Sequence, residues 1–243
     1  MTGQELRSGH DLQFHLALGP GAQAVTKEKP SLPSSPAAQE SAVLIVEDDP
    51  MIREALRRLL GTVGLRAQTF GSASELMQSA FPDAPSCLVL DIRLPGRSGL
   101  DLQVELAKAG VRIPIVFMTG HGDIPMSVQA MKAGAVDFLT KPFRDQEMLD
   151  AVAAAIEGDR ARRIDEEETS RLRALFESLS AREREVMALA TAGLMNKQIA
   201  GELGLSEITV KIHRGHAMKK MQARTLADLV RMAETLGIHR AKR

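Results

Sequence analysis

Side chains that could transfer a phosphoryl group follow four apolar runs of this sequence. Glu47 and Asp48 come after AVLIV, Asp91 ends CLVLD, Thr119 ends IPIVFMT, and Lys141 follows AVDFLT. Crowded carboxylates repel one another unless a cation joins them, and oxygen ligands with room for water suit Mg²⁺. A carboxylate beside a metal, a hydroxyl and an ammonium can accept a phosphoryl group as a nucleophile. If the fold brings these ends together, the sequence predicts a phosphoryl-transfer site.

Residues 41–158 alternate short apolar runs with helical patterns, five times over. This alternation predicts an α/β doubly wound, flavodoxin-like domain with a five-stranded parallel sheet covered by helices on both faces. Ligands bind at the carboxyl ends of such strands. If the strand order is 2-1-3-4-5, strands one and three are neighbours, and Glu47, Asp48 and Asp91 must lie close together. Asp49, directly before a proline, is instead the expected N-cap of the next helix.

The four motifs VLIVEDD, CLVLDIRLPGRSGLDL, VFMTGHGD and DFLTKPF stand in a fixed order. Through them, residues 42–157 resemble the receiver domain of two-component response regulators. The resemblance implies that a sensor histidine kinase phosphorylates Asp91. It also implies that Mg²⁺ is bound by Glu47, Asp48, Asp91 and the main-chain carbonyl of Arg93. The implied contacts to the phosphoryl group are Thr119 and Lys141. Glu47 stands where aspartate is commoner, so we expect it to reach the metal through water.

The same resemblance suggests how the receiver responds. It implies that Phe138 is an aromatic switch that turns inward when Thr119 moves toward the phosphoryl group, and plain core packing of Phe138 is the alternative. In similar regulators the surface formed by PMSVQAMKAG and DFLTKP dimerises on phosphorylation. We therefore expect a phosphorylation-dependent homodimer.

Residues 159–178 are charged and rich in good helix formers, which predicts a helical linker. Residues 179–243 contain four helical patterns and no strand pattern, which predicts a small all-α domain. Capping residues and glycines mark the expected helix ends: Ser180, Gly193, Gly204 and Ser206.

The chain as a whole carries 31 basic and 31 acidic residues. This balance argues against a polyanion partner only as long as the chain is taken as a whole. Residues 41–158 carry 11 basic and 15 acidic residues, whereas residues 173–243 carry 13 basic and 7 acidic residues. The net charge of zero therefore arises because an acidic part and a basic part of the chain cancel.

The long helical pattern after Ser206 has two faces. Residues suited to a core recur on one: Val210, Ala217, Met218 and Met221. The other face combines apolar, basic and small side chains: Ile208, Lys211, Ile212, Gly215 and Lys219. Such a face suits a DNA major groove, where apolar groups meet thymine methyls and lysine reaches guanine or phosphate. A merely solvated face is the alternative.

The short helix NKQIAGEL, a turn and this longer helix have helix-turn-helix spacing. Residues 179–236 resemble the LuxR-type helix-turn-helix through RERE, NKQIA and LGLSEITVKIH. The resemblance implies sequence-specific binding of duplex DNA. The implied base contacts are Lys211, Ile212 and Gly215, and the implied contacts to the backbone or its fringe are Asn196, Lys197, Thr209, His213 and Arg214. Gly215 replaces longer side chains of some relatives, so one base contact is expected to be absent.

Together the two parts resemble the FixJ-like branch of NarL/FixJ response regulators. The resemblance implies a transcription regulator, more often an activator than a repressor, whose partners are a cognate kinase, promoter DNA and RNA polymerase. It implies no enzyme activity beyond the receiver's own phosphorylation and dephosphorylation. One alternative, an aspartyl-phosphate phosphatase, needs a substrate cap and a second acid/base aspartate, and DIRLPGRSG contains neither. The other, a degenerate receiver, would lack one of Asp48, Asp91, Thr119 or Lys141.

The remaining features are expected to be structural. Residues 1–40 end in a Pro/Ser/Ala-rich stretch, which predicts a disordered leader. Cys87 lies in an apolar run, which predicts a buried thiol without a disulfide and fits a reducing compartment. No apolar run approaches the roughly 18 residues of a membrane span, so we expect a cytoplasmic protein with no membrane partner.

Overall fold

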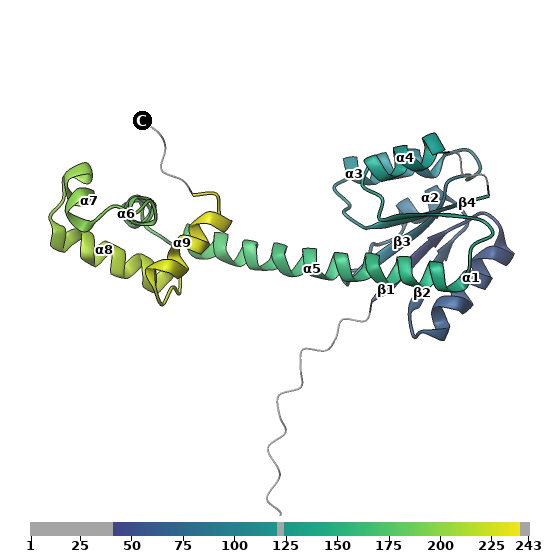
Figure 1. The fold of residues 1–243 in the computed structure, drawn as a ribbon, viewed down its shortest axis with the longest axis horizontal. Coiled ribbons are helices and arrows are strands. Elements are labelled where there is room, and N and C mark those ends of the chain that lie inside the picture. The colour runs from purple at the N-terminus through teal and green to yellow at the C-terminus, as the bar shows by residue number, and fades with distance from the viewer. Residues whose placement is uncertain (1–40, 121–123, 239–243) are drawn as a thin grey trace, which may run out of the picture. The chain divides into compact units, whose positions relative to one another are not determined.

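The structure is a computed structural model that describes residues 41–120 and 124–238. The leader expected at residues 1–40 lies outside these ranges. Residues 41–120 and 124–158 form a sheet covered by helices, and residues 179–238 form a cluster of helices (Figure 1). None of the helices in the described ranges is long and apolar enough to cross a membrane.

The sheet has five parallel strands in the predicted order β2-β1-β3-β4-β5. The strands are β1 (Ala42–Val46), β2 (Arg66–Phe70), β3 (Ser86–Asp91), β4 (Ile115–Thr119) and β5 (Asp137–Thr140). Val46 of β1 pairs with Leu90 of β3, so the next residues along, Glu47 and Asp91, reach the same edge of the sheet. This register confirms the expected doubly wound fold and creates the acidic site.

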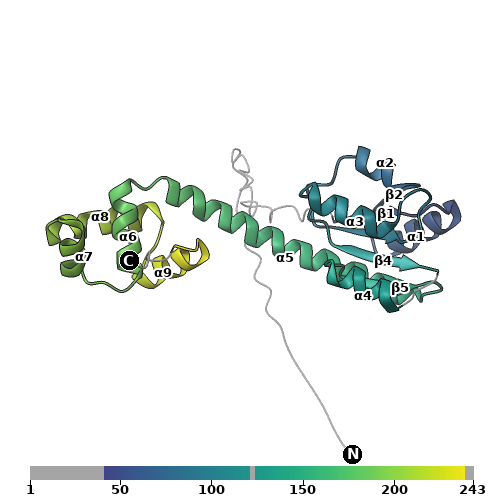
Figure 2. The same ribbon diagram turned by 90° about the horizontal axis from the view of Figure 1, so that it is seen from above.

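Alternate residues of the central strands enter two separate cores. The helices that flank the sheet are α1 (Pro50–Thr62), α2 (Ala73–Gln78), α3 (Gly99–Lys108), α4 (Ile124–Lys132) and α5 (Asp145–Glu177). Figure 1 shows α2 to α4 on one side of the sheet and α1 and α5 on the other, and Figure 2 shows the same fold turned by 90°. Leu44, Leu88 and Phe117 pack with α2 to α4, and Val43, Cys87 and Val116 pack with α1 and α5. Burial on both faces explains why β3 and β4 are continuous apolar runs. Cys87 is fully buried, as predicted, and burial raises the pKa of its thiol.

Helix α5 continues past Gly158, where the sequence predicts a change from receiver to linker. Good helix formers on both sides outweigh the helix cost of one glycine, which is about 1 kcal/mol. The buried carboxylate of Asp159 then accepts hydrogen bonds from the Ser86 amide at 3.0 Å and from Arg163 Nε at 2.8 Å. The helical turn after Gly158 is therefore fixed to the start of β3.

The C-terminal helices are α6 (Ala181–Thr191), α7 (Asn196–Leu203), α8 (Glu207–Lys220) and α9 (Leu226–Thr235), which confirms the four predicted helices. Ser180 and Glu183 form a capping box before α6, and Ser206 caps α8 through the amide of Thr209. Gly204 ends α7 in the left-handed conformation, with φ at 66°. The turn between α7 and α8 is therefore short, as a helix-turn-helix requires.

Candidate phosphoacceptor site and DNA-binding surface

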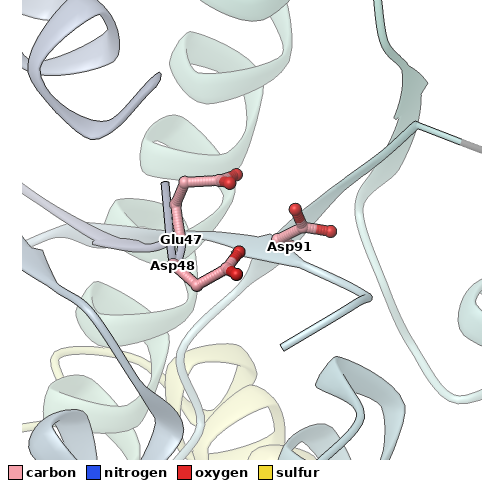
Figure 3. A group of neighbouring side chains, drawn as sticks. All are labelled: Glu47, Asp48 and Asp91. Atoms are coloured by element: carbon pink, nitrogen blue, oxygen red, sulfur yellow. The ribbon is translucent and has the colours of Figure 1, made fainter. Parts of the chain in front are cut away.

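Three carboxylates gather where strands β1 and β3 end (Figure 3). One oxygen from each of Glu47, Asp48 and Asp91 lies within 4.8 Å of the others. Glu47 is 1% and Asp91 5% exposed, whereas Asp48 is open to solvent. The carboxylates of Glu47 and Asp91 are therefore buried, whereas the side of the group at Asp48 is open to solvent. This arrangement suits a site that an ion or a phosphodonor must reach.

Lys141 completes this group from the loop after β5. Its ammonium nitrogen lies 2.6 Å from Glu47 Oε2 and 2.7 Å from Asp91 Oδ2. The Lys141 amide donates a 2.7 Å hydrogen bond to the carbonyl of Thr119, which is buried at the end of β4. All five polar residues that the sequence places at strand ends thus lie at one edge of the sheet.

Burial controls the protonation of this site. Desolvation raises the pKa of Glu47 from 4.5 to about 7, against the hydrogen bond from Lys141, which lowers it. Desolvation opposes the charge of Lys141 as well, but the bonds to Asp91 and Glu47 outweigh it, so the pKa of Lys141 is raised. The ammonium is therefore held in its charged form beside Asp91.

The donor set fits Mg²⁺. Three carboxylates offer only oxygen ligands, and exposed Asp48 leaves room for water in the remaining coordination positions. The amide of Arg93 donates a 2.9 Å hydrogen bond to Asp91 Oδ1, which orients that carboxylate while the Arg93 side chain remains exposed. Glu47, Asp48, Asp91 and the Arg93 carbonyl remain the predicted ligands.

Gly99 shapes the site, although the sequence predicts no role for it. A Cβ atom on Gly99 would lie 2.4 Å from the carbonyl oxygen of Asp91 and 3.0 Å from Cα of Ile92, both main-chain atoms. The Gly99 amide also donates a 2.8 Å hydrogen bond to the carbonyl of Ile92. Helix α3 can start this close to Asp91 only because residue 99 has no side chain. The GRSG turn before α3 is the sequence signal that could have indicated it.

Phe138 lies on β5, half-buried against the core that faces α3 and α4. This position is compatible with both the switch and plain core packing. Beside it, α4 and the turn after it expose apolar side chains: Val128, Met131 and Val136 are 44%, 46% and 39% exposed. Val128 and Met131 belong to the surface on which the sequence predicts dimerisation, and Val136 lies between the two segments that form it.

Helix α8 has the two faces that the sequence predicts. Val210, Ala217 and Met221 are fully buried, whereas Ile208 is 74% and Ile212 51% exposed. The basic and small residues of the outer face are exposed as well: Lys211, Gly215 and Lys219. The exposed isoleucines favour a surface that contacts a partner over a merely solvated one.

The residues predicted to contact the DNA backbone lie on α7 and α8. Arg214 Nη1 donates a 3.0 Å hydrogen bond to Asn196 Oδ1, which joins the two helices. Lys197 is exposed at the start of α7. The Thr209 hydroxyl lies 2.8 Å from the Ser206 hydroxyl within the N-cap of α8, and His213 is half-buried. Thr209 thus serves the helix start in addition to any DNA contact.

Glu183 holds α8 in place, a contact that the sequence does not predict. This buried residue of α6 accepts hydrogen bonds from Lys220 Nζ at 2.7 Å and from the Ser180 amide at 2.8 Å. These bonds lower the pKa of Glu183 to about 2. Helix α8 is therefore attached to α6 through a charged hydrogen bond near its C-terminal end.

The chain is similar to known proteins along both parts. Residues 43–153 match the response regulator receiver domain family, and residues 177–233 match the bacterial regulatory proteins of the luxR family. Nodulation protein W of Bradyrhizobium diazoefficiens is 63% identical over 202 residues, which are 83% of this chain and 89% of that protein. The transcriptional regulatory protein FixJ of Rhizobium meliloti is 41% identical over 191 residues, or 79% and 94% of the two chains.

Among solved structures, the response regulator StyR is 49% identical and covers 80% of this chain and 98% of its own, with a TM-score of 0.72. A receiver sheet with acidic strand ends, followed by a LuxR-type helix-turn-helix, defines a DNA-binding response regulator of a two-component system. The chain belongs to the FixJ-like response regulators.

Proposed function

We propose that this response regulator is switched on when a cognate sensor histidine kinase phosphorylates Asp91. The observation that carries the proposal is the bridge from Lys141 to both Glu47 and Asp91 at the carboxyl edge of the sheet. An ammonium in that place can neutralise charge on phosphoryl oxygens. The phosphatase alternative needs a second acid/base aspartate near Asp91, and residues 92–99, which follow Asp91, contain none.

In the transfer step, an oxygen of Asp91 attacks the phosphorus of the kinase phosphohistidine. The new P–O bond forms as the P–N bond breaks, and the histidine nitrogen retains the electron pair. Lys141 exchanges its bond to Asp91 for one to a phosphoryl oxygen, and the Thr119 hydroxyl donates to another. Glu47, Asp48, Asp91 and the Arg93 carbonyl would hold Mg²⁺, which would supply positive charge against the phosphoryl oxygens. Attack by water on the same phosphorus then breaks the P–O bond to Asp91, releases inorganic phosphate and returns the carboxylate to its starting state.

Phosphorylation replaces the single charge of the Asp91 carboxylate by a phosphoryl group with about −1.5 to −2 charges and three acceptor oxygens. It shifts the receiver toward the state whose donors and cations interact best with that group. We infer that Thr119 moves inward, that Phe138 follows, and that the surface of α4 and β5 forms a homodimer. The exposed apolar side chains Val128, Met131 and Val136 support this choice of surface. Two DNA-binding domains in a dimer can bind two half-sites about one helical turn apart.

We infer that the output is transcription, through α8 in the major groove. Lys211, Ile212 and Gly215 face the bases, and Asn196, Lys197, Thr209, His213 and Arg214 lie toward the backbone. The name of the FixJ relative, a transcriptional regulatory protein, supports this output. We further propose that the bound regulator contacts RNA polymerase at the promoter. By family resemblance we propose activation over repression.

A phosphodonor experiment tests the proposal on the full chain. Wild type and Asp91→Asn are incubated with MgCl₂ and acetyl phosphate, and their mass in solution and DNA affinity are measured. We expect wild type to gain one phosphoryl group, dimerise and bind DNA more tightly, while Asp91→Asn remains monomeric. Phosphodonor-dependent dimerisation of Asp91→Asn would contradict the assignment, and repeated turnover of a phosphate ester by wild type would favour the phosphatase.

A further inference from the structure

Arg53, in the second turn of α1, contacts the main chain of the acidic site. Its Nη1 atom donates hydrogen bonds to the carbonyl oxygen of Glu47 at 2.7 Å and to that of Asp48 at 2.8 Å. One guanidinium nitrogen therefore contacts both peptide units that carry the acidic side chains of the β1–α1 loop. The Arg53 side chain is half-buried, so water competes with these bonds less than at an open surface.

The loop that Arg53 contacts lies between two regular elements. The amide of Glu47 donates a 3.2 Å hydrogen bond to the carbonyl of Phe70 at the end of β2. Helix α1 begins with the 3.0 Å hydrogen bond from the Arg53 amide to the Asp49 carbonyl. Residues 47 and 48 lie between these two bonds, where the chain leaves the sheet and enters α1. The guanidinium thus ties this loop to the helix that follows it.

We propose that Arg53 is a positioning residue for the Mg²⁺ site. By fixing the two carbonyls, it sets the backbone from which the carboxylates of Glu47 and Asp48 project toward Asp91. The inference rests on the proposed function, because it assigns a role toward the ion that phosphorylation requires. Groups that orient metal ligands typically change metal affinity by 10- to 100-fold when they are removed.

The shape of the guanidinium distinguishes positioning from charge alone. Lysine retains the positive charge but presents a compact ammonium on a flexible stem, whereas arginine presents a rigid planar fork. Methionine retains part of the stem and removes both charge and donors. A role in positioning therefore predicts a graded loss in the order Arg53, Arg53→Lys, Arg53→Met.

Arg58 offers a matched control on the same helix. It pairs with Glu54 at 2.8 Å, its side chain is 77% exposed, and Glu54 also pairs with Arg57. Arg58→Met removes the same charge and the same number of atoms as Arg53→Met. A difference between the two variants therefore reports on the contact with the acidic loop.

The experiment is calorimetric titration of MgCl₂ into the full chain, for wild type, Arg53→Met, Arg53→Lys and Arg58→Met. Thermal unfolding without Mg²⁺ shows which variants are folded. We expect Arg53→Met to bind Mg²⁺ at least about tenfold more weakly than wild type. Arg53→Lys should fall between them, and Arg58→Met should match wild type.

The outcomes separate this inference from the proposed function. Equal Mg²⁺ affinity of folded Arg53→Met and Arg58→Met overturns the role of Arg53 alone. If Arg53→Met does not fold, Arg53→Lys provides the test. A folded Arg53→Lys that binds Mg²⁺ as tightly as wild type overturns the proposal that the planar guanidinium positions the site. If wild type itself fails to bind Mg²⁺ at millimolar concentration, the Mg²⁺ step of the proposed function is wrong, and the inference falls with it.

Discussion

The ammonium nitrogen of Lys141 lies 2.7 Å from a carboxylate oxygen of Asp91, although 50 residues separate them in the chain. Asp91 ends β3 and Lys141 follows β5, with β4 between these two strands. The lysine side chain is long enough to extend past the end of β4 to reach the carboxylate. Its bond to Asp91 links the end of β3 to the loop that joins β5 to α5.

Lys141→Met should destabilise the receiver in the absence of metal. Glu47 and Asp91 would remain buried without their cation, and the loss of one partner of a partly buried ion pair costs about 2 to 3 kcal/mol. MgCl₂ should restore more stability to this variant than to wild type, because the ion replaces the missing positive charge. Urea unfolding with and without MgCl₂ measures both effects.

Lys108→Met serves as the control for Lys141→Met, since Lys108 is an exposed residue in the last turn of α3. It should unfold like wild type under both conditions. Equal urea midpoints for Lys141→Met and Lys108→Met would show that the ion pairs of Lys141 do not stabilise the fold.

One chemical change should have opposite effects at two glycines. In Gly99→Ala the new methyl group meets the Asp91 carbonyl oxygen at 2.4 Å, so main-chain atoms must shift, at a cost of about 1 to 3 kcal/mol. Gly158 lies inside α5, and a methyl group added there would have nothing within 4 Å, so Gly158→Ala should stabilise by roughly 0.5 to 1 kcal/mol. Thermal unfolding should show a lower midpoint for the first variant and a higher one for the second. Equal midpoints would contradict the close approach of α3 to Asp91.

Lys211→Ala and Lys197→Ala should weaken DNA binding in different ways. If Lys211 bonds both acceptors of a guanine, its loss costs about 1 to 3 kcal/mol and relaxes the preference at one or two base pairs. Loss of Lys197, on the fringe of the surface, should weaken all sequences alike and reduce the salt slope by about one ion. Footprinting and titration over a salt series distinguish them. An unchanged footprint and slope for Lys211→Ala would contradict the assignment of α8 as the recognition helix.

The stability of the DNA-binding domain should fall in acid through Glu183. Its pKa is 4.5 as an ordinary side chain and about 2 in the folded protein, so the unfolded chain binds the proton first. Its contribution is therefore complete above pH 4.5 and is lost as the pH falls toward 2. Glu183→Gln should be less stable than wild type at pH 7, and the gap should narrow with decreasing pH. A gap that stays constant from about pH 7 to about pH 3 would contradict this account.

The strand order, the position of the acidic site and the faces of α8 could be predicted from the sequence. Apolar runs that end in Glu47, Asp91 and Thr119 leave few alternatives once the sheet is parallel, and helical spacing separates Val210 from Ile208. The assigned roles in Mg²⁺ binding, phosphorylation and DNA contact remain predictions.

The contacts of Gly99, Arg53 and Glu183 could not be predicted in the same way. Each depends on how closely a helix approaches a loop or another helix, and that distance is set by packing across the fold. The continuation of α5 past Gly158 is likewise not predicted, because the bond between Asp159 and Ser86 joins residues 73 positions apart.

Complete burial of Cys87 has a practical consequence for spectroscopy. It is the one cysteine in the sequence, which also lacks tryptophan and tyrosine, and its thiol has a raised pKa and is 0% exposed. A cysteine introduced on the surface would therefore react with a maleimide dye without removal of the native thiol. Likewise, an introduced tryptophan would supply an emission signal against a background free of other indoles. Conformational changes in this regulator can thus be followed by reporters placed one at a time.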